Sequence, residues 1–392
     1  MSTKFKPEKF VNPNLKEIPE SPISELSKKA QRYKNVISLG RGEPDFNLPS
    51  YLKQAMVRAL KENQTHYTPV GSLPELNEKI AKKLEKENKI KVKASDIVVG
   101  SGSSPVLQAA IATLTNLGDR VMITDPTYLM YITLIRSLGR ECTFVPVNEK
   151  NGFVPTYEDL KKAYKKKTKL ILIDFPSNPT GATITKKKLQ EIADFAVENN
   201  LLVISDEIYE KIIYDDAKHY SIGSFKGMKN RVITINGFSK AFAMTGLRVG
   251  YAAGPTKLMK HIYNYNYFGH ICPSVPSLYV ALEAMKNPRA KSFVKRQVKE
   301  YDRRRKYIVK KLNEMDIYTP MPKGAFYVFA NFSKIERNSY KLSHRILDKA
   351  KVITIPGSAF GPHGEGFLRL SYATKYELIV KAMDRLEKLF KK

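Results

Sequence analysis

A lysine follows one of the apolar, strand-like runs of the chain, in the stretch NGFSKAFAMTGLRVGY over residues 236–251. Most lysines of the chain stand in solvated clusters such as KKAYKKKTK, but Lys240 lies among small, apolar and hydroxyl residues. A partly desolvated lysine near other cations has a lowered pKa, and its free amine is nucleophilic. Taken alone, the segment favours a lysine that extends to solvent, so the neighbouring strands decide its interpretation.

A carboxylate, a phenol and an amide follow two other apolar runs. Asp206 comes directly after the run 200–205, and Tyr209 stands three residues later. The carboxylate either caps a helix or faces a buried cation. Asn178 follows the run 169–174 in the stretch FPSNPTGA, where a plain turn is the simpler interpretation.

Two more runs end beside groups that suit a ring and a phosphate. Tyr128 follows the run 119–124, where an aromatic side chain either stacks on a flat ring or, more commonly, packs in the core. After the run 96–100, Ser104 is predicted to cap a helix that has Pro105 in its first turn. Free N–H groups at such a helix end bind phosphate, although an ordinary capped helix is an equal alternative.

Short apolar runs and helical patterns alternate through the middle of the chain. This alternation predicts an α/β fold, with a mostly parallel sheet flanked by helices. Ligands of such sheets bind beyond the carboxyl ends of the strands. There an amine, a carboxylate, an amide, a phenol, a phosphate site and the guanidinium of Arg248 would meet. This set suits a cofactor with an aldehyde, a phenolic oxygen, a phosphate and a basic ring nitrogen. The predicted strands are 96–100, 119–124, 169–174, 200–205 and 231–236.

The pattern changes near residue 288, where a long basic helix is predicted to run to about residue 315. The segments KGAFYVF, VITIPG and FLRLSYA then read as strands, and a last amphipathic helix follows. We therefore expect a large α/β domain over 50–287. A second, smaller α+β domain would combine 1–49 with 288–392.

Composition limits the class of protein. The 392 residues carry a formal charge of +29 and two isolated cysteines, which indicates neither a disulfide framework nor a metal site. No secretory signal or apolar membrane span is apparent, so a cytoplasmic protein without membrane contact is expected. The basic charge raises the possibility of nucleic acid binding. The lysines, however, are spread over many predicted helices, so no nucleic acid is expected.

The chain resembles the pyridoxal-phosphate-dependent aminotransferases of class I and II, the aspartate aminotransferase superfamily. The likeness covers nearly the whole chain, and the lysine motif behind NPTG and DEIY is its most specific part. It implies the type I fold of these enzymes, with pyridoxal 5'-phosphate as cofactor. The segments that carry it are ISLGRGEPDF, HYTPVGSLPEL, PSNPTGA, SDEIYEKIIYD, FSKAFAMTGLRVGYA, PKGAFYVF and FLRLSYA.

The resemblance assigns roles to the residues at the strand ends. Lys240 looks like the lysine that holds the cofactor aldehyde as a Schiff base and later moves the Cα proton of the substrate. Asp206 is similar to the carboxylate that keeps the pyridine nitrogen protonated, and Tyr209 and Asn178 to the pair that binds the phenolic oxygen. The other cofactor positions implied are Tyr128 for stacking and Ser103, Ser104, Ser239 and Arg248 for the phosphate.

The same resemblance implies a substrate site and a partner subunit. Arg369 matches the arginine that grips the α-carboxylate, with Gly42 and Asn178 beside it. Tyr67 resembles a tyrosine that reaches the phosphate of the neighbouring subunit, which implies a homodimer with shared active sites. Two positions depart from the common pattern. Gly237 replaces a phosphate-binding serine, and Arg41 replaces a small or apolar residue.

The implied activity is transfer of an amino group from an L-amino acid to a 2-oxo acid. We expect Arg41 to favour aspartate or glutamate as donor, although a surface orientation of its side chain is an equal alternative. A C–S β-lyase on the same fold is the alternative enzyme. A nucleic-acid-binding regulator that keeps the fold is the alternative of another class, and the intact Lys240, Asp206 and Arg369 argue against it.

Overall fold

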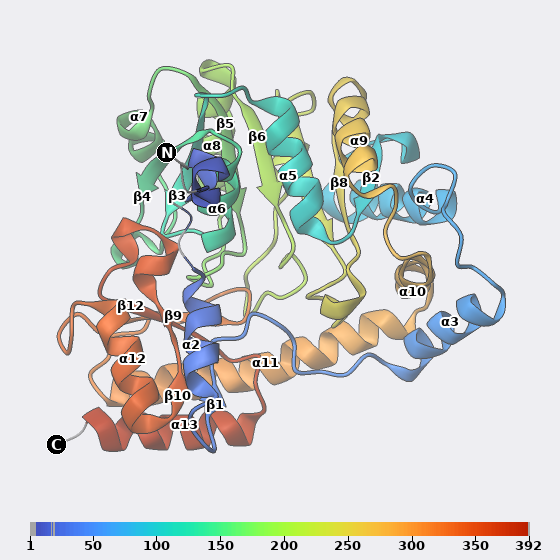
Figure 1. Cartoon of the computed structure of the whole chain (residues 1–392). Coiled ribbons are helices and arrows are strands. Elements are labelled where there is room, and N and C mark those ends of the chain that lie inside the picture. Colours follow the sequence, from blue (N-terminus) through green and yellow to red (C-terminus); the bar gives the residue numbers. More distant parts are fainter. Residues whose placement is uncertain (1–4, 17, 19, 391–392) are drawn as a thin grey trace.

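A seven-stranded sheet forms the centre of the computed structural model, which describes residues 5–16, 18 and 20–390 (Figure 1). The strand order is β2-β8-β7-β6-β5-β3-β4, and β8 alone runs antiparallel to its neighbours. The mostly parallel sheet predicted from the sequence is therefore confirmed. The strands are β2 (Ile97–Gly100), β3 (Arg120–Asp125), β4 (Glu141–Pro146), β5 (Thr168–Asp174), β6 (Leu202–Asp206), β7 (Val232–Gly237) and β8 (Gly250–Ala253).

Two of these strands were not predicted. β4 lies at the edge of the sheet, and its residues alternate between exposed and buried, so it has no continuous apolar run. β8 reads GYAA and lacks the β-branched residues that mark a strand. The bounds of the five predicted strands agree with the observed ones to within two residues at each end.

Helices cover both faces of this sheet, which explains why its central strands are largely apolar. On β3, Val121 packs with α5, α6 and α9, whereas Met122 packs with α7 and α8 on the opposite face. A further cluster joins α3, α4 and α10 to β2 and β8. The helices are α3 (Ser50–Lys61), α4 (Pro74–Lys83), α5 (Ser103–Leu114), α6 (Leu129–Ser137), α7 (Tyr157–Ala163), α8 (Lys186–Glu198), α9 (Thr256–His270) and α10 (Val275–Lys286).

The helix α11 (Arg289–Glu314) connects this part to a second group of elements (Figure 1). There an antiparallel sheet has the order β11-β12-β9, and β1 from the N-terminal segment pairs with β10. Tyr301, Ile308 and Leu312 of α11 are buried in the core of this group. The remaining elements are α1 (Pro13–Lys16), α2 (Pro22–Ala30), β1 (Ile37–Ser38), β9 (Tyr327–Asn331), α12 (Ser339–Ala350), β10 (Val352–Ile353), β11 (Ile355–Pro356), β12 (Phe367–Ser371) and α13 (Tyr376–Phe390).

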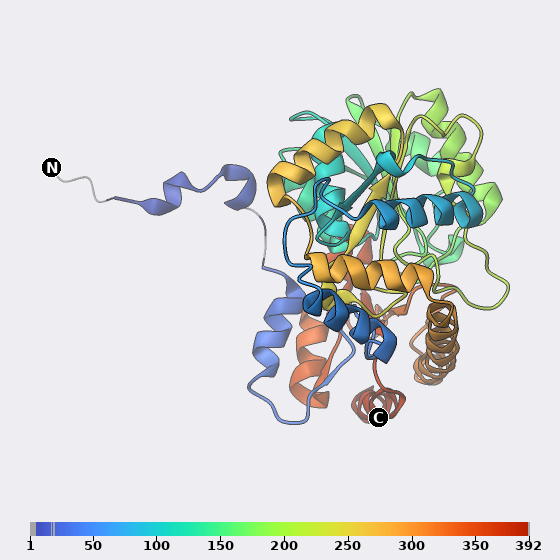
Figure 2. The same ribbon diagram turned by 90° about the vertical axis from the view of Figure 1, so that its right-hand side faces the viewer.

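Short single-turn helices occupy several of the connections. Residues 5–16 extend to one side of the molecule (Figure 2). No helix within the described ranges is long and apolar enough to cross a lipid bilayer. The short helices are η1 (Pro7–Phe10), η2 (Leu84–Asn88), η3 (Ala94–Asp96), η4 (Glu149–Asn151), η5 (Ile222–Ser224), η6 (Thr245–Leu247), η7 (Gly357–Phe360) and η8 (Pro362–Gly364).

Candidate active site

Lys240 lies beside the carboxyl ends of β6 and β7, which are neighbours in the sheet. Its Nζ donates a hydrogen bond of 2.6 Å to the carbonyl oxygen of Gly42 and lies 6.0 Å from the centre of the Tyr209 ring. The structure therefore brings residues from the N-terminal segment, from the turn after β6 and from the turn after β7 to one place.

Burial is the main cause that lowers the pKa of Lys240 to about 8. The guanidinium groups of Arg369 and Arg248 lower this pKa further, whereas Glu43 and Asp206 oppose the shift. A larger fraction of the amine is therefore unprotonated near neutral pH than for a solvated lysine. An unprotonated amine is the form that attacks an aldehyde.

Asp206, the last residue of β6, is 6% exposed, and its burial raises the pKa of the carboxyl group to about 6. Two donors stabilise the charged form: the Tyr131 hydroxyl at 2.8 Å from Oδ2 and the Ile208 N–H at 3.1 Å from Oδ1. Tyr131 was not predicted as a site residue. Its position three residues after Tyr128, in the first turn of α6, was the signal that could have found it.

Two tyrosines lie together beside Lys240. The hydroxyl oxygens of Tyr209 and Tyr327 are 2.7 Å apart and share a hydrogen bond. Tyr327, on β9, was also missed by the sequence analysis.

Tyr128 packs edge-on against Tyr131 at 5.3 Å between ring centres, and burial raises the pKa of Tyr128 to about 12. All these phenols are therefore neutral donors or acceptors at physiological pH.

Arg369 is a buried cation without a carboxylate partner among the described residues. Its Nη1 donates to Asn178 Oδ1 at 3.0 Å and its Nη2 to the Gly40 carbonyl at 2.6 Å. Its Nε has no hydrogen-bond partner, and the guanidinium lies 4.5 Å from the centre of the Tyr327 ring. A buried charge of this kind is costly unless an anion pairs with it.

The amino end of α5 meets Arg248. The helix begins at Ser103 with Gly102 before it, so the prediction of Ser104 as the cap is wrong. Gly102 has a φ of 102°, which favours glycine, and a Cβ on it would lie 2.3 Å from Nη2 of Arg248. The absence of a side chain thus lets the guanidinium sit against the first turn of the helix, where N–H groups and a cation favour an anion.

The glycine that replaces the expected serine has a packing reason. Gly237 pairs with Gly250 across β7 and β8, and a Cβ on Gly237 would lie 3.0 Å from both the Gly250 Cα and the Val249 carbonyl. A side chain here would crowd β8. Ser239, two residues later, is buried at the same edge of the sheet.

Two predicted residues lie at the surface instead of inside the cluster. Tyr67 is 74% exposed, and the side chain of Arg41 is 73% exposed. Arg41 forms a long ion pair of 3.6 Å with Glu43. The exposure of Arg41 matches the surface alternative that the sequence left open. Neither residue has a hydrogen bond to the buried cluster within the described ranges.

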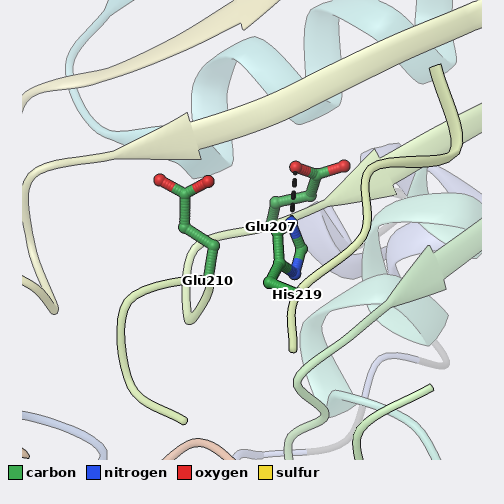
Figure 3. Close-up of side chains that lie close together, drawn as sticks. All are labelled: Glu207, Glu210 and His219. Carbon is green, nitrogen blue, oxygen red and sulfur yellow. Dashed lines mark hydrogen bonds and ion pairs between the residues drawn. The ribbon is translucent and has the colours of Figure 1, made fainter. Parts of the chain in front are cut away.

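Glu207, Glu210 and His219 lie close together (Figure 3), and Glu207 directly follows Asp206 in the chain. His219 Nε2 lies 2.9 Å from Glu207 Oε2, and Asn88 donates to both glutamates at 3.0 and 2.8 Å. Glu210 also pairs with Lys83. Protein donors thus surround these carboxylates, and the network fixes the turn that carries Asp206 and Tyr209.

Comparison with known proteins gives a family match over most of the chain. The family model described as aminotransferase class I and II matches residues 34–386. An aspartate aminotransferase of Pyrococcus abyssi is 44% identical over 95% of this chain and 96% of its own length.

Two further relatives differ in name from the first. An aromatic-amino-acid aminotransferase of Thermococcus litoralis is 40% identical over 96% of this chain and 97% of its own length. The crystal structure of an aromatic aminotransferase from Pyrococcus horikoshii covers 93% of this chain and 98% of its own, with 44% identity and a TM-score of 0.89.

Proposed function

The chain belongs to the class I and II aminotransferase family, and from this premise we propose which residues hold the cofactor and move the amino group. As a member, it is a pyridoxal-phosphate-dependent transaminase with the type I fold. The proposal assigns the covalent attachment to Lys240, the ring nitrogen to Asp206 and the substrate carboxylate to Arg369.

The residues at the sheet edge fit pyridoxal 5'-phosphate. Lys240 offers an amine with a lowered pKa to an aldehyde, and Asp206 offers a buried negative charge to a pyridinium nitrogen. Arg248 and the first turn of α5 form a cradle for a phosphate. A Cβ on Gly102 would intrude into this cradle and meet the guanidinium of Arg248. When bound, the cofactor takes up the electrons released as a bond at the substrate Cα breaks.

Asp206 and the phenols tune this site. The Tyr131 hydroxyl stabilises the ionised form of Asp206, and an ionised Asp206 would hold a proton on the ring nitrogen. Tyr209 and Asn178 supply a hydroxyl and an amide for the phenolic oxygen. Ser103, Ser104 and Ser239 offer hydroxyls near the cradle, and Tyr128 offers a ring face for stacking.

The substrate is oriented by Arg369. Its guanidinium carries an unpaired Nε and can bind the α-carboxylate with two N–H groups. A substrate fixed in this way presents its Cα–H to Lys240. The free amine of Lys240 would accept this proton and later donate it to a different atom. The backbone of Gly42 already accepts a hydrogen bond from Lys240 and lies within reach of the same substrate.

The observation that carries the assignment is the partly buried Lys240 amine, which donates a hydrogen bond to the Gly42 carbonyl and whose pKa is shifted by the charges of Arg369 and Asp206. Borohydride treatment of the holoenzyme, digestion and mass spectrometry should find a pyridoxyl group on the peptide that contains Lys240. In Lys240→Ala the adduct should be absent and kcat should fall at least about 10³-fold. The exposed control Lys257→Ala should show the adduct and the kcat of the wild type. An adduct on another lysine would disprove the assignment.

The donor is proposed to be a dicarboxylic amino acid, because Arg41 places a weakly paired positive charge next to Gly42. Relatives named for aspartate and for aromatic amino acids are nearly equally similar, so names do not decide this point. We expect Arg41→Ala to lower kcat/KM for aspartate two- to fivefold relative to phenylalanine, as for an exposed charge pair. An unchanged ratio of the two donors rejects the role of Arg41.

A homodimer in the cytoplasm completes the proposal. Tyr67 and Phe268 are 74% and 85% exposed, respectively, and large exposed apolar side chains gather at interfaces. A Cβ on Gly71 would lie 3.1 Å from the Ile271 carbonyl, so the loop that follows Tyr67 lies against the end of α9. A second copy covering this face would bring its Tyr67 towards the phosphate cradle.

A further inference from the structure

A cavity of about 940 Å³ lies between α4, the end of α10 and the first half of α11. We call it the α4–α11 cavity, and Figure 2 shows the three helices on the same side of the molecule, away from residues 5–16. Its lining includes residues 236–238, 241 and 242 but neither Ser239 nor Lys240. The cavity is therefore separate from the proposed cofactor site, although one chain segment borders both.

The wall of this cavity carries a large excess of positive charge. Nine lysines and four carboxylates line it. Lys83 and Lys211 pair with glutamates of the same wall, and Lys286 pairs with Glu75. Six of the lining lysines have no ion pair with any described residue, and these are Lys79, Lys82, Lys86, Lys291, Lys295 and Lys299.

The rest of the lining is largely apolar, with one free polar donor. Phe238 and Ala284 are buried beneath the cavity, and Val294 and Val298 of α11 face it while half-exposed. Asn236 also lines the cavity and is 3% exposed. Its Oδ1 accepts from the Gly237 N–H at 2.7 Å, but its Nδ2 has no hydrogen-bond partner. A buried donor without a partner is costly unless a ligand or water accepts from it.

We propose that the α4–α11 cavity is a binding site for a small organic anion with an apolar body, such as an aliphatic or aromatic carboxylate. The apolar lining takes the body of the ligand, the unpaired lysines neutralise its charge, and Asn236 supplies a hydrogen bond. The volume falls within the range of roughly 300–1,000 Å³ that is usual for small-molecule sites. A nucleic acid binds along an extended basic surface. The α4–α11 cavity has a buried apolar lining, which favours a small organic anion over a nucleic acid.

The test is isothermal titration calorimetry of the holoenzyme with sodium octanoate, and with 1-octanol as the uncharged probe of equal length. We expect octanoate to bind at least tenfold more tightly than 1-octanol. The double variant K82E/K295E should weaken octanoate binding at least tenfold. Its matched control K165E/K166E changes the net charge equally, at exposed lysines outside the cavity, and should change binding less than twofold.

A second variant tests the shape of the site without changing its charge. Val294→Trp places a large side chain in the cavity from a half-exposed position on α11 and should also weaken octanoate binding at least tenfold. Equal octanoate affinity in wild type, K82E/K295E and Val294→Trp would place the ligand elsewhere, for example at Arg369, and overturn the proposal. Absence of octanoate binding together with heparin binding that depends on Lys82 and Lys295 would overturn it in favour of a polyanion surface.

Discussion

The hydroxyl of Tyr131 donates a 2.8 Å hydrogen bond to Oδ2 of Asp206, and both side chains are buried. Only one other donor, the Ile208 N–H, reaches this carboxylate within the described residues. Burial raises the pKa of Asp206 to about 6, so the two donors decide how much of it is ionised at neutral pH. Tyr131 is therefore a positioning residue that acts through Asp206.

Tyr131→Phe should raise the pKa of Asp206 further, because the ionised form loses a hydrogen bond. A hydrogen bond to a charged group contributes about 1.5–3 kcal/mol, which is roughly one to two pKa units, so we expect kcat at pH 7 to fall roughly two- to fifteenfold. The deficit should shrink as the pH rises, since higher pH restores the ionised carboxyl group. The control is Tyr157→Phe, which removes a surface hydrogen bond to Glu198. A pH-independent deficit would contradict the role of Tyr131.

Much of the site could be predicted because parallel strands share one edge. Asp206 and Lys240 follow neighbouring strands, and the sequence shows directly which residues stand there. Tyr327 could not be found in this way, because β9 belongs to another sheet and reaches Tyr209 only through tertiary packing. The contact of Arg369 with Gly40 likewise joins two distant segments of the chain.

Local conformation explains the errors in detail. Ser104 was expected to cap α5, but the positive φ of Gly102 lets the helix start two residues earlier. β8 was not predicted because close packing against β7 selects glycine and alanine in this strand. These small residues give no recognisable strand pattern in the sequence. The six unpaired lysines of the α4–α11 cavity belong to α4 and η2 and, far away in the sequence, to α11, so their common wall was not apparent.

Asp206→Asn should stabilise the apoprotein while it abolishes function. The folded-state pKa of Asp206 is raised from 3.8 to about 6, so the folded state holds the proton more tightly than the unfolded state between these values. The wild type therefore loses stability as the pH rises through this window. The stability gained by Asp206→Asn should grow from near zero at pH 4 to about 3 kcal/mol at pH 7.

Urea unfolding of both apoproteins between pH 4 and pH 8 measures this difference. The same variant should lose most turnover in the presence of cofactor, because a neutral amide cannot stabilise a protonated ring nitrogen. A constant stability difference across this range would show that Asp206 does not titrate there.

The rate of cofactor attachment to the apoprotein should follow the titration of Lys240. Its pKa is lowered to about 8, chiefly by burial, and only the unprotonated amine attacks an aldehyde. The attachment rate at fixed pyridoxal 5'-phosphate should rise about tenfold per pH unit below pH 8 and level off above it. Stopped-flow absorbance measures the rate. A rise that continued to pH 10 would indicate a solvated lysine.

Phe268→Glu should dissociate the proposed homodimer. Phe268 is 85% exposed on α9, and a charge at the centre of an apolar interface is desolvated without a partner. Light scattering should show half the mass of the wild type, and turnover should fall because the proposal has Tyr67 reach the phosphate cradle of the partner subunit. Tyr318→Glu, at a 55% exposed tyrosine elsewhere, is the control. A dimer that persisted in Phe268→Glu would place the interface on another face.

Arg369→Lys should lower kcat/KM for the amino donor about 100-fold, mainly through KM. The substitution keeps the positive charge but removes the planar fork, and an ammonium group cannot bind a carboxylate with two parallel N–H groups. The lysine also cannot replace both hydrogen bonds of Arg369, to Asn178 Oδ1 and to the Gly40 carbonyl, at the same time. Arg303→Lys changes an exposed fork that binds Glu300 and should leave kinetics unchanged.

Cofactor attachment separates this effect from general damage to the site. Lys240 should retain its pyridoxyl adduct after borohydride treatment of Arg369→Lys, because the role proposed for Arg369 is to bind the substrate and not the cofactor aldehyde. A fall in kcat/KM below threefold would mean that another cation binds the α-carboxylate. The exposed Arg41 would then be the next residue to test, since it precedes Gly42, whose carbonyl accepts the hydrogen bond from Lys240.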